Sequence, residues 1–63
     1  MKDFSELDEL ALGIVLSLPV SVVHRARETP YLISVVREQL PDESVAVVDG
    51  VAAAIQRRLG LRQ

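Results

Sequence analysis

Prolines at positions 19, 30 and 41 divide this chain of 63 residues at intervals of eleven residues. Proline ends or kinks a helix and interrupts a central strand, because its ring fixes the backbone and it has no N–H to donate. The chain is therefore restricted to four short segments. A chain of this length forms one domain at most, and we expect a single helical domain over residues 1–63.

Apolar residues recur with helical periodicity in the first, third and last segments. The spacing alternates between three and four residues at both ends of the chain, which places these side chains on one face of a helix. The expected fold is therefore all-α, a small bundle of three or four short helices. The stripes consist of Phe4, Leu7, Ala11, Ile14 and Leu18 in the first segment, Leu32, Ile33, Val36 and Leu40 in the third, and Val45, Val48, Ala52, Ile55 and Leu59 in the last.

Four residues predict where helices begin and end. Thr29 is a favourable N-cap, and Pro30 after it suits the first helical position. Asp42 is the expected cap of the last helix. Gly60 stands where a helix commonly ends on a left-handed residue.

The Asp49-Gly50 pair allows two interpretations of the last segment. Between apolar runs such a pair is typical of a β-hairpin turn, but the alanine-rich run after it is a poor strand, so we favour a helix. A glycine inside a helix costs about 1 kcal/mol relative to alanine. Ala46, Gly50 and Ala54 are spaced four apart, and such small residues allow another helix to approach closely. We expect that crossing helix to come from the same chain or from a partner, and we favour a partner.

Hydrophobic residues make up 49% of the chain, and there is no cysteine for a disulfide. A domain this small buries only about 60% of the surface of its unfolded chain, and exposed apolar patches mark interfaces. We therefore expect the bundle to be completed by a homodimer or by a partner helix. The candidate partner-binding residues are Leu12, Leu16, Ala46, Gly50, Val51, Ala54 and Arg58.

Charge is distributed unevenly between the two ends. Residues 1–18 carry four acidic residues and one lysine, whereas residues 54–63 carry three arginines and no acid. Both ends agree with the helix dipole, which favours acids early and cations late in a helix. The alternative is that the acidic end of one chain meets the basic end of another. We favour the first explanation.

No catalytic, cofactor-binding or metal-binding arrangement is predicted, and we do not expect an enzyme. His24 is the only histidine and lies four residues before Glu28. These two side chains supply fewer ligands than a typical metal site needs. We therefore interpret His24 as a surface histidine near a carboxylate.

The expected function is a small protein–protein interaction module, an adaptor, docking or regulatory domain. The alternative is a helix-turn-helix-like DNA-binding regulator, which a net charge of −2 disfavours. Residues 10–23 are uncharged, but they are too few to span a membrane and Pro19 interrupts them. We therefore expect a cytoplasmic protein with no membrane partner.

Overall fold

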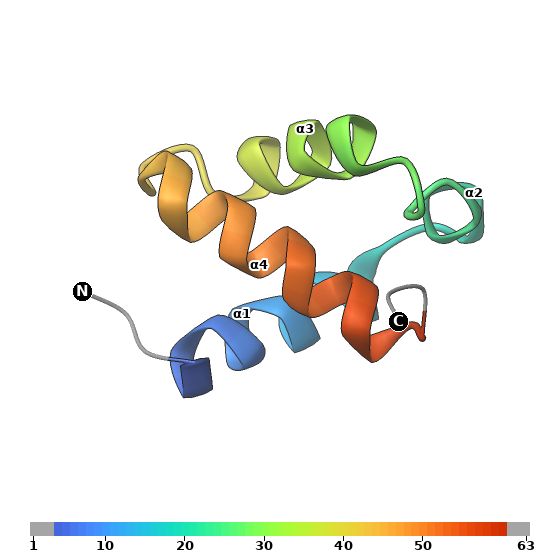
Figure 1. Cartoon of the computed structure of the whole chain (residues 1–63). Helices are drawn as coiled ribbons and strands as arrows, with labels where there is room; N and C mark the ends of the chain where they lie inside the picture. The colour runs from blue at the N-terminus through green and yellow to red at the C-terminus, as the bar shows by residue number, and fades with distance from the viewer. Residues whose placement is uncertain (1–3, 61–63) are drawn as a thin grey trace.

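The computed structural model describes residues 4–60, and these residues form four helices and no strand: α1 (Phe4–Ser17), α2 (Val20–His24), α3 (Thr29–Gln39) and α4 (Val45–Arg58) (Figure 1). The all-α prediction is confirmed. Asp49 and Gly50 lie inside α4, so the hairpin alternative is wrong. Within residues 4–60, none of the helices has both the length and the apolar character needed to cross a membrane.

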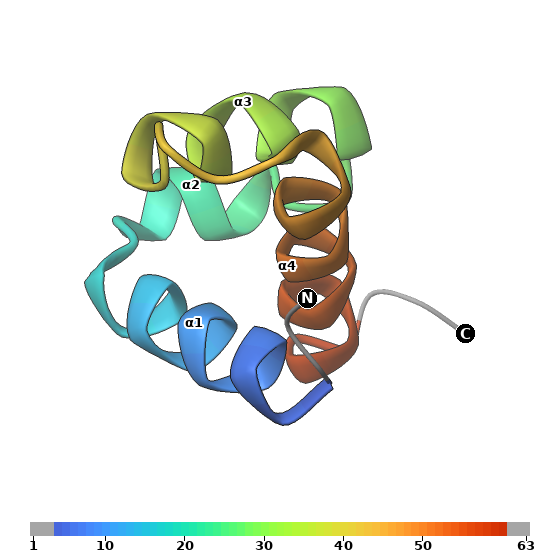
Figure 2. The ribbon, with the colours of Figure 1, turned by 90° about the vertical axis from the view of Figure 1, so that its left-hand side faces the viewer.

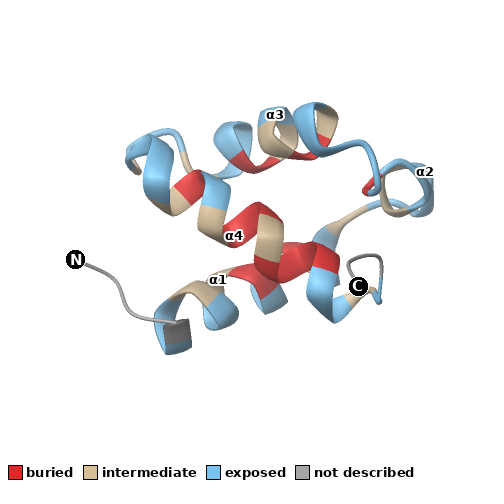
Figure 3. Ribbon diagram, in the orientation of Figure 1, coloured by how far each residue is buried: buried red, intermediate tan, exposed pale blue. Residues whose placement is uncertain are grey.

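Helix α4 lies between α1 and α3 and packs against both of them (Figure 1). Helix α2 is only five residues long, contains no buried residue, and joins α1 to α3 at one end of the molecule (Figure 2). The buried positions of α1 and α3 are turned toward α4 (Figure 3). The hydrophobic core consists of Ala11, Ile14, Ala26, Leu32, Val36, Val48, Val51, Ala52, Ala54 and Ile55.

The predicted apolar stripes supply most of this core. Leu7 of α1 and Leu18, which follows α1, are partly buried against it, as are Ile33, Leu40 and Leu59. The prediction for Val45 is wrong, because this first residue of α4 is 65% exposed. The buried face of α4 is wider than its predicted apolar stripe, because α1 and α3 both cover it. The side chain of Phe4 lies outside the described part of the structure.

Two of the predicted N-caps are displaced. The N-cap of α3 is Glu28, one residue earlier than expected, and it makes no side-chain capping bond. Thr29 instead accepts a hydrogen bond from the Gln56 side chain. The N-cap of α4 is Ser44 and not Asp42, because the Ser44 hydroxyl accepts a hydrogen bond from the backbone N–H of Val47 at 3.3 Å.

The end of α4 is as predicted. Gly60 has a φ of +74°, in the left-handed region that favours glycine. Its N–H donates to the carbonyl of Arg57, and the N–H of Leu59 donates to that of Ile55. These bonds satisfy carbonyl groups that the last turn of a helix otherwise leaves without a partner.

The assignment of Ser44 as the cap of α4 predicts the effect of removing its hydroxyl. Ser44→Ala is expected to lower the free energy of unfolding by about 1 kcal/mol, the usual cost of losing an N-cap side chain. Asp42→Ala, two residues earlier, is the matched control and should change it by less than about 0.5 kcal/mol. Urea denaturation measures both values. If Asp42→Ala lowered the free energy of unfolding more than Ser44→Ala, Asp42 would be the N-cap of α4, as expected from the sequence.

Candidate functional site

The outer face of α1 carries two exposed leucines. Leu12 is 40% exposed and Leu16 is 78% exposed. They lie four residues apart, so they are neighbours on one side of the helix, whereas Ala11 and Ile14 point into the core. We call Leu12 and Leu16 the α1 stripe.

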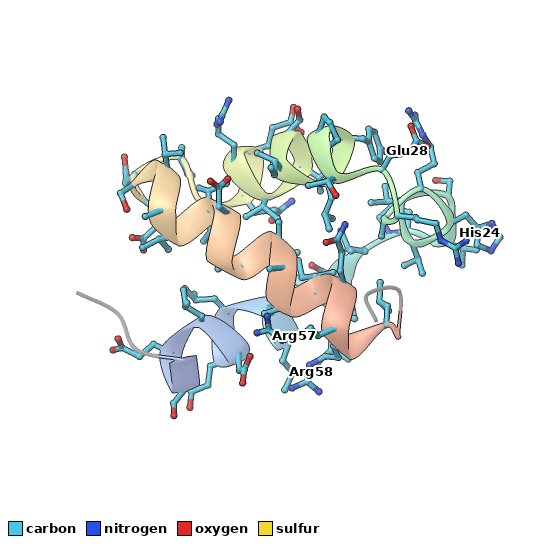
Figure 4. The ribbon with its side chains drawn as sticks, in the orientation of Figure 1. His24, Glu28, Arg57 and Arg58 are labelled. Carbon is cyan, nitrogen blue, oxygen red and sulfur yellow. The ribbon has the colours of Figure 1, made fainter. Side chains whose placement is uncertain are left out.

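A shallow pocket with two arginines lies at the N-terminal end of the α1 stripe. It is lined by Asp8, Ala54, Arg57 and Arg58, and Figure 4 shows the two arginine side chains reaching from α4 toward α1. Asp8 lies one turn before Leu12 on the same helix, so the pocket is next to the stripe. The Nη2 atom of Arg57 lies 3.7 Å from Oδ1 of Asp8.

The Asp8–Arg57 pair bears on the uneven distribution of charge between the two ends of the sequence. The acidic start of α1 and the basic end of α4 meet within one chain. Both side chains are about half exposed, at 54% and 51%, so solvent screens the pair and it contributes less than about 1 kcal/mol. The second guanidinium of the pocket, that of Arg58, is also on an exposed residue.

Glu9 lies beside the α1 stripe. Asp8 is four residues before Leu12 and continues the row of Leu12 and Leu16, whereas Glu9 is about 100° farther round the helix than Asp8. Glu9 is exposed. The α1 stripe is therefore an apolar line with the arginine pocket at its N-terminal end and a carboxylate beside it.

Of the seven predicted partner-binding residues, some are exposed in the structure and others are buried. Leu12, Leu16 and Arg58 are exposed, as a partner site requires, and they lie at or beside the stripe and pocket. Ala46 is also exposed, but it belongs to the first turn of α4, at the far end of that helix from Arg58.

The other three predicted positions face α1 or the core of the same chain. Val51 and Ala54 are 0% and 3% exposed, so they offer almost no side-chain surface to a partner, although Ala54 lines the pocket. An ideal Cβ atom on Gly50 would lie 3.0 Å from Cδ1 of Leu7. Gly50 therefore marks a close approach, as the sequence indicated, but the crossing helix is α1 of the same chain. This corrects our preference for a partner helix at Gly50.

His24 and Glu28 do not form a site together. Figure 4 shows His24 at the end of α2, and Glu28 is bound by Arg25 through contacts of 3.2 and 3.4 Å. The pKa of Arg25 lies above its ordinary value, chiefly because Glu28 accepts its hydrogen bond and also because the carboxylate charge is close. The Arg25 guanidinium lies 3.9 Å from the centre of the Tyr31 ring. Among the residues that the structure describes, no group of histidines and acidic residues could hold a metal ion.

Gln56 is a residue that the sequence did not single out. It is 3% exposed, and its Nε2 atom donates to the carbonyl of Ala26 at 3.0 Å and to Oγ1 of Thr29 at 3.1 Å. These bonds hold the corner between α2 and α3 against α4. Its position four residues after Ala52, on an apolar face, was the available signal, since a polar residue there must find partners.

Comparison with known proteins adds no relative, because no family model, curated protein or solved structure matches the chain.

Proposed function

We propose that the chain is a small protein–protein interaction module that binds its partner through the α1 stripe. The observation that carries the proposal is the exposure of Leu16, at 78%, on a helix whose opposite face already supplies the core. The fold does not need this side chain. A partner that buries it gains about 1.5–3 kcal/mol from the hydrophobic effect.

The surroundings of the stripe have the composition of a contact surface. Interfaces combine an apolar centre with a polar, charged rim, and here the leucines are flanked by the two arginines of the pocket and by Glu9. An exposed apolar side of a helix also suits pairing with another amphipathic helix. Such a partner would cover Leu12 and Leu16 and leave the charged groups at the edges.

We expect Leu16→Glu to abolish protein contact without unfolding the chain. A charge in the centre of an apolar interface loses its hydration and has no partner there, but at a position that is mostly exposed in the single chain it has little effect on the fold. Val45→Glu is the matched control, because Val45 is 65% exposed at the distant start of α4. The mass in solution over a hundredfold range around micromolar concentration, together with affinity capture by immobilised chain, measures binding to a second copy or to another protein.

The proposal requires that Leu16→Glu lose the binding that the unaltered chain and Val45→Glu retain, with all three equally helical by circular dichroism. It is contradicted if the unaltered chain neither self-associates nor captures a protein, or if Leu16→Glu binds as well as Val45→Glu. Binding of duplex DNA that falls steeply with salt and is unchanged in Leu16→Glu would instead support the helix-turn-helix-like alternative.

A further inference from the structure

We draw no further inference here: the strongest candidate, the exposed apolar surface patch of Leu12 and Leu16 on the outer face of α1, belongs to the site already described, and nothing in residues 4–60, the part of the chain that the structure describes, shows what covers it.

Discussion

Gln56→Met is expected to lower the free energy of unfolding by about 1–3 kcal/mol, although the two side chains are similar in size. Methionine fills the space but cannot donate to the carbonyl of Ala26 or to the hydroxyl of Thr29, which Gln56 Nε2 reaches at 3.0 and 3.1 Å. The residue Ala26 is fully buried, so a carbonyl that loses its donor there loses a hydrogen bond that water does not readily replace. Denaturation in urea measures the loss.

The control for this substitution is Gln39→Met, at the exposed end of α3. It makes the same chemical change where water can hydrate the backbone, and it should alter stability by less than about 0.5 kcal/mol. Amide hydrogen exchange adds a local measurement, because loss of the Gln56 bonds should speed exchange in residues 25–32 more than in α1. Equal stability of Gln56→Met and the unaltered chain would show that these two bonds do not hold the corner.

Gly50→Leu is expected to destabilise the single chain by about 1–3 kcal/mol, the usual cost of overpacking a close contact. A Cβ atom alone would already lie 3.0 Å from Cδ1 of Leu7, and leucine adds three more carbons. The gain in helix propensity on replacing the glycine is at most about 1 kcal/mol, so the steric term prevails. The loss should appear at concentrations where the chain is monomeric, because both helices belong to one chain.

Two further variants make the explanation for Gly50 testable. Leu7→Ala removes the obstructing side chain, so Gly50→Leu should cost at least about 0.5 kcal/mol less in that background. Gly13→Leu is the matched control in α1, since a Cβ atom there meets nothing within 4 Å, and it should be neutral or stabilising. If Gly50→Leu were harmless, or if its cost did not depend on Leu7, the close approach would not explain the glycine.

The helices could be predicted from the sequence because proline spacing and apolar periodicity are local properties. The exposed leucines of α1 were predictable for the same reason, since Leu12 and Leu16 fall outside the stripe that faces the core. The cap of α4 was less certain, because acidic residues and a serine follow Pro41 within three positions and any of them can accept a backbone hydrogen bond.

Two features of the site depend on distant parts of the chain and could not be read locally. The steric demand at Gly50 is the same whether the crossing helix comes from one chain or from two, so the sequence could not distinguish α1 from a partner. The role of Gln56 depends on carbonyl and hydroxyl groups that lie 30 and 27 residues earlier. Only the packing of the α2–α3 corner against α4 brings these groups together.

The central position of α4 has a consequence for how the chain is made. Helices α1 and α3 each pack against α4, and α4 is the last of the four to be synthesised. Short isolated helices are marginal in water, so the nascent chain holds its apolar faces uncovered until residues 45–58 have left the ribosome. At about 5–20 residues per second, translation of this helix takes on the order of a second, and folding of the domain waits for it.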